Sequence, residues 1–491
     1  MKMKKDRLPL FYQGKYQAAT SNKIFPNINP ANNRVINQVE CASKKDVDHA
    51  VRSARDAFES WACTAPVARG RILRKAATIL KKRNEEIARI EVQDTGKPIS
   101  EAIEVDVISG ADALEYFGGI APSLHGHHYQ LGASFAYTRR EPIGVCAGIG
   151  AWNYPIQIAC WKSAPALACG NTMVFKPSEL TPQTALILAE TYQEAGLPDG
   201  VFNVVQGGGE VGKMLTTHPA VRKVSLTGEV QTGRNVMKAS ADTLKQVTLE
   251  LGGKSPIIVF ADADLEEAVQ GAMLGNFYTQ GEICSNGTRV FVENAIKNEF
   301  LELLIKRTRA LTIGDPLNPE TKIGALISEA HMDKVLYYIE QGKKEAKLLF
   351  GGNRYLDPGN EGIRNGFFVE PAIFEVSDDN CCIASEEIFG PVLSVFAFAA
   401  EDEVIRRAND TEFGLAAGVF TNDLQRAHRV VSRLEAGVCW INNYNITPVE
   451  IPFGAYKQSG MGRENGLAAI DAYTQLKTVY MEMDKINSPY R

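Results

Sequence analysis

Short apolar runs alternate with amphipathic stretches through the middle of the chain. The runs that predict strands are, in order, residues 145–149, 172–175, 202–205, 221–226, 247–251 and 256–260. Residues 182–195, between the second and third runs, have the spacing of a helix. Strands that alternate with helices indicate βαβ units, which build a parallel sheet.

A second α/β pattern occupies residues 262–440. Its predicted helices are residues 263–276 and 297–311, and its predicted strands are residues 288–292, 348–351, 392–398 and 437–442. Glycine and proline clusters near residues 314–316 and 351–353 separate these elements. We find no internal repeat and no low-complexity linker, so the pattern predicts a second α/β unit.

Two segments fall outside these patterns. Residues 119–141 are irregular and contain His125, His127 and His128. We interpret them as a solvated loop or an edge hairpin rather than a metal site, because no carboxylate or cysteine cluster lies nearby. Apolar and polar side chains alternate over residues 478–483, as in an exposed strand. An unpaired strand edge can pair with a strand of another chain. We therefore expect a homodimer or a homotetramer.

Composition narrows the function classes. The chain has 491 residues, enough for two to four domains, and 45% of them are hydrophobic. The formal net charge is -5 with both signs interspersed, which argues against nucleic acid as a partner. No apolar run approaches the ~18 residues of a membrane span, and we identify no signal peptide. The nine cysteines are scattered without a CxxC motif, so we expect a reduced, cytoplasmic protein.

Two glycine patterns are candidates for phosphate binding. Gly207, Gly209 and Gly212 form G-x-G-x-x-G, which matches a dinucleotide fingerprint but also a plain flexible turn. Residues 225–233 form a strand, a turn at Gly228 and a helix start. A helix N-terminus offers free N–H groups to a pyrophosphate, so this second pattern is the better candidate.

Two side chains are candidates for catalysis. Glu250 stands between two leucines, and burial there would raise the pKa of a carboxyl toward that of a general base. The alternative is a surface glutamate at a strand end. Cys284 lies between a helical run and a strand, and as a thiolate it would be a nucleophile. The alternative is a small buried apolar residue.

Six motifs occur together in one order. They are residues 152–155 (WNYP), 175–179 (FKPSE), 249–254 (LELGGK), 281–284 (GEIC), 387–391 (EIFGP) and 454–464. This order and spacing resemble the aldehyde dehydrogenase superfamily along essentially the whole chain. Within it, residues 161–167, 287–292 and 442–444 are most similar to betaine aldehyde and trimethylaminobutyraldehyde dehydrogenases.

The resemblance implies roles for the catalytic candidates. Cys284 would attack the aldehyde carbon, with the Asn153 side chain and its own backbone N–H forming the oxyanion hole. Hydride would pass to the nicotinamide and leave a thioester, which Glu250 would hydrolyse by activating water. Lys162 and Glu464 match a charge relay, and their alternative is a structural ion pair.

The resemblance also implies NAD as the cofactor. Lys176 and Glu179 match positions that hold the adenosine ribose, and a carboxylate there disfavours the 2′-phosphate of NADP. The full set of implied cofactor residues is Trp152, Lys176, Ser178, Glu179, Gly228, Gly252, Glu387 and Phe389. Glu229 departs from the pattern, since relatives have a small or neutral residue beside the pyrophosphate.

Substrate and metal residues follow from the same resemblance. Tyr154, Trp161, Tyr278 and Phe453 would box a quaternary ammonium group, and Tyr154 and Trp161 are spaced to share a helix face. The alternative is that they are ordinary core aromatics. Implied potassium positions are Asn27, Ile28, Asp94 and Leu180 at one site and Leu244, Lys457 and Gly460 at another.

The expected fold is α/β with a Rossmann-like coenzyme domain over residues 1–122 and 142–252. An α/β catalytic domain would cover residues 253–450, and a small β oligomerisation region residues 123–141 and 468–491. The expected activity is oxidation of betaine aldehyde to glycine betaine. A trimethylaminobutyraldehyde, aminoaldehyde or aliphatic aldehyde dehydrogenase remains an alternative, as does an inactive structural member of the family, against which Cys284, Glu250 and Asn153 together argue.

Overall fold

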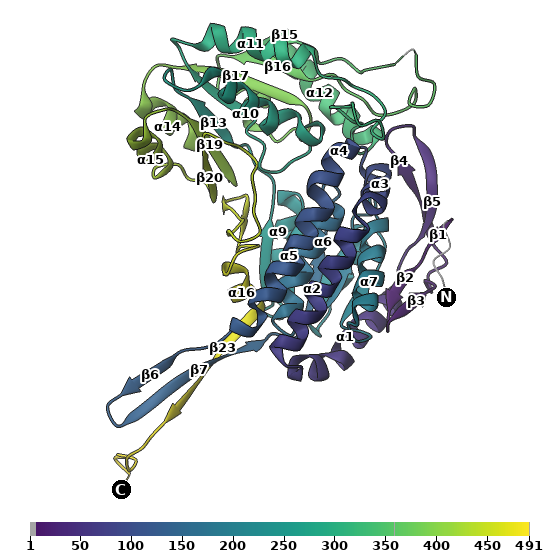
Figure 1. The fold of residues 1–491 in the computed structure, drawn as a ribbon, viewed down its shortest axis with the longest axis vertical. Coiled ribbons are helices and arrows are strands. Elements are labelled where there is room, and N and C mark those ends of the chain that lie inside the picture. Colours follow the sequence, from purple (N-terminus) through teal and green to yellow (C-terminus); the bar gives the residue numbers. More distant parts are fainter. Residues whose placement is uncertain (1–5, 358, 491) are drawn as a thin grey trace.

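The computed structural model describes residues 6–357 and 359–490. Residues 1–5 and 491, which begin and end the expected domain ranges, lie outside the described residues. Two large sheets, each covered by helices, make up most of the molecule, and a narrow arm extends away from both (Figure 1). In the described part of the chain, no helix has both the length and the apolar character needed to cross a membrane.

The first sheet has eight strands in the order β22-β12-β11-β8-β9-β10-β2-β3. Its middle strands, β12 to β10, run parallel, whereas β22 and β2 pair antiparallel to them. The bounds are β2 Leu10–Tyr12, β3 Lys15–Gln17, β8 Val145–Ile149, β9 Thr172–Lys176, β10 Phe202–Val204, β11 Val221–Thr227, β12 Gln246–Glu250 and β22 Gly460–Met461.

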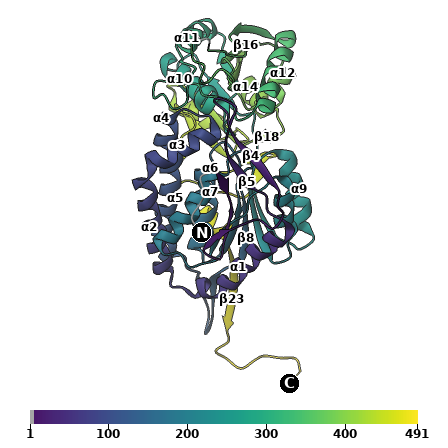
Figure 2. The same ribbon diagram turned by 90° about the vertical axis from the view of Figure 1, so that its right-hand side faces the viewer.

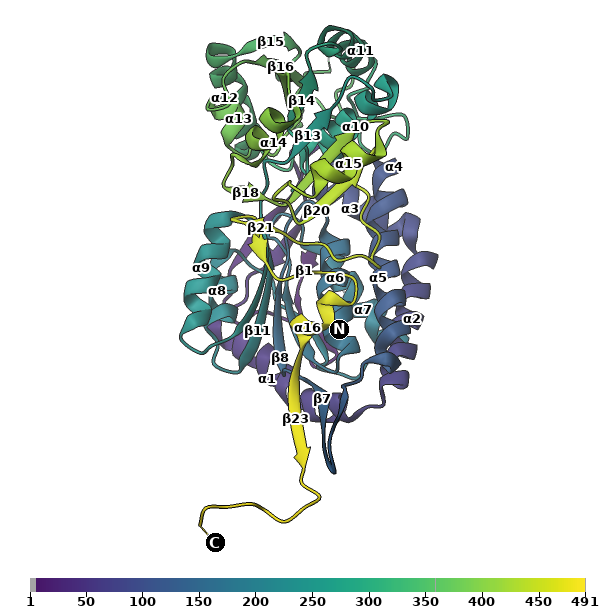
Figure 3. The same ribbon diagram turned by 90° about the vertical axis from the view of Figure 1, so that its left-hand side faces the viewer.

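Helices cover both faces of this sheet (Figures 2 and 3). On one face α1 (Lys44–Cys63), α8 (Gly209–Thr217) and α9 (Val230–Ala241) share an apolar cluster with the strands. The other face packs against α2 (Pro66–Lys82), α5 (Val107–Ile120), α6 (Pro155–Ala168) and α7 (Gln183–Ala195). A parallel sheet buried on both faces explains why its strands are continuous apolar runs in the sequence.

The second sheet has seven strands in the order β15-β16-β17-β14-β13-β19-β20, parallel except for β15. The bounds are β13 Pro256–Val259, β14 Arg289–Glu293, β15 Lys347–Phe350, β16 Ala372–Val376, β17 Val392–Phe398, β19 Ala416–Phe420 and β20 Val438–Ile441. Its helices are α10 Leu265–Phe277, α11 Lys297–Arg309, α12 Glu329–Glu345, α13 Cys382–Ser385, α14 Glu401–Asn409 and α15 Leu424–Val431.

The arm is a three-stranded antiparallel sheet of β6 (His128–Leu131), β7 (Ser134–Pro142) and β23 (Thr474–Met481). The irregular segment with three histidines therefore forms an edge hairpin, one of its two predicted interpretations. The predicted C-terminal strand is present, but it begins four residues earlier than its alternation indicates, directly after α16 (Ala468–Tyr473). Figure 1 shows the arm projecting from the base of the first sheet.

The smaller elements complete the chain. They are β1 Arg7–Leu8, β4 Ile24–Asn29, β5 Arg34–Glu40, α3 Asn84–Thr95, α4 Ile99–Glu101, β18 Phe413–Gly414 and β21 Tyr456–Lys457, with a π-helical turn at Ala102–Asp106. Every predicted strand of the two large sheets coincides with an observed one to within one residue at either end. The predicted elements omit α1 to α5, α12 to α16 and the strands β16 and β19 of the second sheet. All nine cysteines are free.

Candidate active site

A cleft with a volume of about 1240 Å³ is lined by residues of both α/β units. It contains every predicted cofactor residue and three of the five predicted catalytic residues. These are Trp152, Asn153, Lys176, Ser178, Glu179, Gly228, Glu250, Gly252, Cys284, Glu387 and Phe389. The structure therefore gathers residues that are more than two hundred positions apart in the sequence around one space.

Cys284 follows a strained turn. After α10 the chain forms a 3₁₀ turn in which Thr279 and Gln280 have positive φ angles of 49° and 42°. Such left-handed backbone costs about 1–3 kcal/mol per non-glycine residue. Glu101 stabilises the turn by accepting hydrogen bonds from the Thr279 backbone N–H at 2.9 Å and from its hydroxyl at 3.1 Å. The strain is held by tertiary contacts and fixes the direction in which Cys284 leaves the turn.

The Cys284 thiol borders the cleft in a setting that favours its neutral form. Burial raises its pKa to about 12, and the carboxylates of Glu387 and Glu250 add to the effect. A backbone N–H hydrogen bond from Ser285 acts in the opposite direction. Burial therefore favours the thiol form of Cys284 over the thiolate in the free protein.

Glu250 ends β12 and is buried, so the interpretation of a surface glutamate is wrong. Neither carboxylate oxygen has a hydrogen-bond partner among the described residues. Burial raises the pKa of Glu250 well above its usual range, Glu464 raises it further, and Lys162 and Arg463 lower it. A buried carboxylate without partners is rare in proteins and marks a position where a water or a ligand belongs.

Lys162 and Glu464 form a buried ion pair behind Glu250. The Lys162 ammonium lies 2.5 Å from Glu464 Oε1, and it also donates to the Ser225 hydroxyl at 3.1 Å. Ser225 in turn donates to the same Glu464 oxygen at 2.9 Å. Neither charged residue lines the cleft, so both act on it only through Glu250.

Asn153 is anchored at the cleft by its own side chain. Its Nδ2 donates a hydrogen bond to the Glu282 carbonyl at 2.9 Å, and the residue is buried. An amide nitrogen carries two hydrogens, so one N–H is committed to this anchor and the other is free to donate into the cleft. The arrangement fits an oxyanion-hole donor.

Glu387 reaches the cleft over a pair of glycines. The Gly253 N–H donates to Glu387 Oε1 at 2.8 Å, and a Cβ atom on Gly252 would lie 2.1 Å from Oε2. Only glycine therefore allows the carboxylate to approach the backbone this closely. Burial raises the pKa of Glu387 to about 7, against the lowering effect of the Gly253 hydrogen bond.

An aromatic group next to Glu387 includes a residue that the sequence motifs do not contain. The Trp152 ring packs edge-to-face against Phe389 and against His331, with centroids 5.2 and 5.3 Å apart. His331 lies in α12, and its Nε2 is 2.7 Å from the Phe389 carbonyl oxygen. Phe389 has a positive φ of 65°. The only local signal for His331 is Ser328, a helix N-cap whose side chain accepts from the His331 N–H.

The other end of the cleft holds a lysine and both glycine patterns. Lys176 Nζ donates to the carbonyls of Pro177 and Gly207 at 2.6 Å each and lies 3.6 Å from Glu179. Gly209 and Gly212 line the same space, as does Gly228. The G-x-G-x-x-G segment is therefore part of the cleft wall as well as the turn before α8.

Glu229 also lines the cleft. It is the N-cap residue of α9, but its side chain makes no capping hydrogen bond. Its charge makes a small contribution that raises the pKa of Glu387. Glu229 is thus an exposed residue of the cleft wall.

The four predicted substrate aromatics separate into two pairs. Tyr154 and Tyr278 share an apolar cluster with Ile283, next to Cys284. Trp161 and Phe453 contact each other with centroids 5.7 Å apart. The predicted helix face shared by Tyr154 and Trp161 is wrong, because Tyr154 is the N-cap residue before α6 and its backbone angles are not helical (φ -136°, ψ 64°). Pro155 disfavours helical backbone in the residue before it.

The Tyr154 ring already has a cationic neighbour. Lys97 Nζ lies 3.7 Å from its centroid and forms a buried ion pair with Asp106. The Tyr154 hydroxyl is hydrogen-bonded to Thr279 Oγ1 at 2.9 Å, which links it to the strained turn before Cys284.

The potassium positions were predicted as two sites, and of these residues only Asn27 and Asp94 are joined by a hydrogen bond. Asp94 is buried and accepts from Asn27 Nδ2 at 2.8 Å, and burial raises its pKa to about 7. Leu180 borders the cleft. At the second group, Leu244 and Lys457 both have positive φ angles of 51°. Gly460 belongs to β22 and has a φ of 144°.

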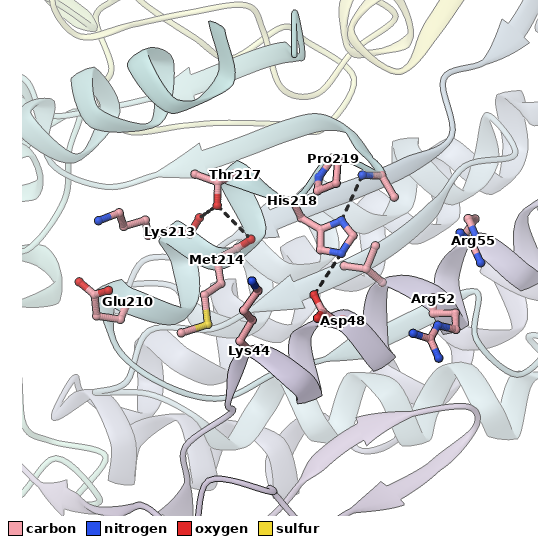
Figure 4. Close-up of a pocket in the computed structure, with 12 residues that line it drawn as sticks. Lys44, Asp48, Arg52, Arg55, Glu210, Lys213, Met214, Thr217, His218 and Pro219 are labelled. Atoms are coloured by element: carbon pink, nitrogen blue, oxygen red, sulfur yellow. Dashed lines mark hydrogen bonds and ion pairs between the residues drawn. The ribbon is translucent and has the colours of Figure 1, made fainter. Parts of the chain in front are cut away.

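A second cavity, of about 620 Å³, lies between α1 and α8 and contains none of the predicted site residues. Figure 4 shows His218 facing Asp48 across it, and their nitrogen and oxygen atoms are 3.3 Å apart. The walls carry exposed charges of both signs.

Comparisons with known proteins identify the family and similar folds. The model of the aldehyde dehydrogenase family matches residues 16–479. A betaine aldehyde dehydrogenase of Brucella anthropi is 56% identical over 98% of each chain. The NAD⁺ complex of an aldehyde dehydrogenase from Bacillus cereus superposes with a TM-score of 0.95 at 41% identity, over 98% of this chain and 97% of that one.

A γ-glutamyl-γ-aminobutyraldehyde dehydrogenase from Burkholderia cenocepacia superposes with a TM-score of 0.94 at 42% identity, over 97% of each chain. The predicted resemblance and the predicted fold class are thereby confirmed. This chain belongs to the aldehyde dehydrogenase family.

Proposed function

We propose that this protein oxidises betaine aldehyde to glycine betaine with NAD as the acceptor. The observation that carries the proposal is Glu250, a buried carboxylate that has no hydrogen-bond partner among the described residues and borders the same cleft as Cys284. A nucleophile and a base facing one cavity are the minimum needed to form and hydrolyse a thioester. The 56% identity to the Brucella anthropi betaine aldehyde dehydrogenase supports the choice of substrate.

The cleft residues fit NAD. Lys176 and Glu179 line the cleft and would bind the ribose hydroxyls. Gly228 begins the turn into the N-terminus of α9, which would stabilise a pyrophosphate. Glu387 would hold the nicotinamide ribose, with Phe389 beside the ring. The remaining members of this proposed set are Trp152, Ser178 and Gly252. When bound, NAD supplies the hydride acceptor. The carboxylate of Glu179 favours NAD over NADP.

The chain's own residues would supply the other steps. The Cys284 thiol releases its proton to solvent water, its sulfur attacks the aldehyde carbon, and the free Asn153 N–H and the Cys284 backbone N–H donate to the oxygen. Glu250 accepts a proton from the water that hydrolyses the thioester. Lys162 and Glu464 keep that carboxylate in a charged environment and relay the proton away.

The substrate side of the proposal depends on four aromatic rings. Tyr154 and Tyr278 share the apolar cluster of Ile283, and Trp161 and Phe453 form a second pair. A desolvated cation–π contact contributes about 0.5–2 kcal/mol. Because Lys97 already occupies one face of Tyr154, we assign the trimethylammonium group mainly to the other three rings. Aminoaldehydes are the second candidate, since the Burkholderia cenocepacia relative is named for one.

The proposal extends to assembly, location, domain division and potassium. We infer a homodimer or homotetramer joined through the arm, and a cytoplasmic location. The three-domain division at residues 122, 142, 252 and 450 is consistent with how the strands divide between the two large sheets. Potassium bound by backbone oxygens near Asn27 and Lys457 completes the set.

A panel of kcat/KM values tests the proposal. It compares betaine aldehyde, 4-trimethylaminobutyraldehyde, 4-aminobutyraldehyde and hexanal, each with NAD and with NADP. We expect betaine aldehyde with NAD to give the highest value. Equal values for hexanal and betaine aldehyde would contradict the aromatic recognition, and turnover retained in Cys284→Ala would contradict the chemistry.

A further inference from the structure

Two loops from different α/β units meet at the proposed reaction centre. Asn153 and Tyr154 lie between β8 and α6, and the turn that precedes Cys284 lies between α10 and β14. Asn153 Nδ2 donates a hydrogen bond to the Glu282 carbonyl at 2.9 Å. The Tyr154 hydroxyl lies 2.9 Å from Thr279 Oγ1. These two hydrogen bonds link the segment of the proposed nucleophile to the loop of its oxyanion donor.

Thr279 is an unfavourable residue for the turn that it occupies. Its φ of 49° lies in the left-handed region, which β-branched residues rarely adopt. Gln280, the next residue, is left-handed as well, with a φ of 42°. Backbone of this kind persists only where the surrounding structure holds it. Without such a contact the turn would relax, and the direction of the chain into Cys284 would change with it.

The contact that holds the turn comes from Glu101 in the short helix α4. Its Oε2 accepts hydrogen bonds from the Thr279 backbone N–H at 2.9 Å and from the Thr279 hydroxyl at 3.1 Å. A hydroxyl has one hydrogen, so Thr279 Oγ1 donates to Glu101 and accepts from the Tyr154 hydroxyl. Both Glu101 and Thr279 are buried. Glu101, Thr279 and Tyr154 therefore form one directed chain between the two loops.

We propose that Glu101 is a positioning residue, which keeps Cys284 aligned with the Asn153 N–H through its two hydrogen bonds to Thr279. The inference deepens the proposed function, in which Cys284 is the nucleophile, and rests on it. Glu101 is not one of the residues that line the cleft, so it acts only through the turn. Its loss should misplace the nucleophile and leave the cofactor residues, which lie on other segments, in place.

The oxygen of Glu101, and not its charge, is the feature that this role requires. The Lys97 ammonium is already paired with Asp106 at 2.5 Å. Burial raises the pKa of Glu101 to about 8, while Lys97 and the Thr279 hydrogen bonds lower it. A neutral carboxyl group keeps a carbonyl oxygen with two lone pairs, and so does the amide of glutamine. Glutamine should therefore replace Glu101 in this role, whereas alanine should not.

The experiment compares Glu101→Ala and Glu101→Gln with the full-length wild type. We expect kcat to fall about 100-fold in Glu101→Ala, which is the effect of a displacement of about 1 Å at a reacting atom. Kd for NAD, measured by calorimetric titration, should not change. Glu101→Gln should have nearly the kcat of the wild type. Hydrogen-exchange mass spectrometry should show faster exchange in the peptide that contains Thr279 in the alanine variant.

Glu40→Ala is the matched control. Glu40 of β5 is also buried and accepts hydrogen bonds from a backbone N–H, that of Ala19, and from the Arg7 side chain. It is not one of the residues that line the cleft. The substitution should lower the melting temperature and leave kcat unchanged. If Glu101 served stability alone, Glu101→Ala would behave in the same way.

A folded Glu101→Ala variant with the kcat of the wild type would overturn the inference, as would a Glu101→Gln variant as slow as Glu101→Ala. If Glu101→Ala does not fold, the pair Thr279→Val and Thr279→Ser decides. Valine lacks the hydroxyl that joins Glu101 to Tyr154, and serine keeps it. We expect kcat to fall in Thr279→Val alone, and equal kcat values in the two variants again overturn the inference.

The proposed function and this inference fail in different ways. A wild type without aldehyde turnover would overturn the proposed function itself. An active wild type whose kcat does not depend on the Glu101 oxygen or the Thr279 hydroxyl overturns this inference alone.

Discussion

At the scale of single residues, the proposed reaction depends on the protonation of Glu250. Burial and then Glu464 raise its pKa, while Lys162 and Arg463 lower it. A base must be ionised to accept a proton from water, so turnover limited by Glu250 increases as pH rises through this raised pKa. The sign is opposite for a general acid with the same pKa, whose activity would fall over that range.

Replacing Glu250 with glutamine tests this role. Glu250→Gln keeps the shape and removes the proton acceptor, so we expect steady-state kcat to fall by about 100-fold or more. One equivalent of NADH should still form rapidly, because thioester formation precedes the step that needs the base. Stopped-flow absorbance measures both phases. A kcat within twofold of wild type would contradict the assignment.

At the scale of elements, the sequence predicts strands better than helices and better than the site. Strands of the two sheets are continuous apolar runs because both of their faces are buried. Tyr154 shows where spacing fails, since Pro155 places the start of α6 after it. His331 shows a second limit: it reaches Trp152 from another α/β unit, and no local pattern encodes that contact. The catalytic set itself was predictable only through the order of its motifs.

The second prediction concerns the backbone of Gly252 and Gly253, which follow β12. In Gly252→Ala the new methyl group meets the Glu387 carboxylate, whose Oε2 would lie 2.1 Å away. We expect NAD to bind more weakly and kcat to fall at least tenfold, since Glu387 must leave its place. Calorimetric titration and steady-state rates measure the two effects.

Gly119→Ala is the control for that substitution. Gly119 lies in α5, and a Cβ atom there meets nothing within 4 Å. Alanine is the better helix former, so stability should stay equal or rise slightly. If Gly252→Ala kept the NAD affinity and kcat of the wild type, as expected for this control, the close approach of Glu387 would contribute to neither cofactor binding nor turnover.

At the scale of the whole molecule, the arm has a strand edge that remains unpaired in a single chain. In the described part of the chain β23 pairs with β7 along one side only, and the exposed residues Leu476, Tyr480 and Met481 lie on it. A long edge strand with apolar side chains is a surface for pairing with another copy. In Figure 1 the arm projects away from the two large sheets.

Shortening the chain tests this surface. A variant that ends at Tyr473 lacks β23 and should be monomeric at concentrations where the full chain is a dimer or tetramer. Light scattering after size-exclusion chromatography measures the mass. A truncated chain that keeps the full oligomer would show that the arm is not the interface.

The central claim is that Cys284 carries the substrate as a thioester. Intact and peptide mass spectrometry of Glu250→Gln, quenched in acid after mixing with NAD and betaine aldehyde, tests it most directly. The account predicts one acyl group per chain, located on the peptide that contains Cys284, and none in Cys284→Ala. Steady aldehyde oxidation by Cys284→Ala, or an acyl group on any other residue, would contradict it.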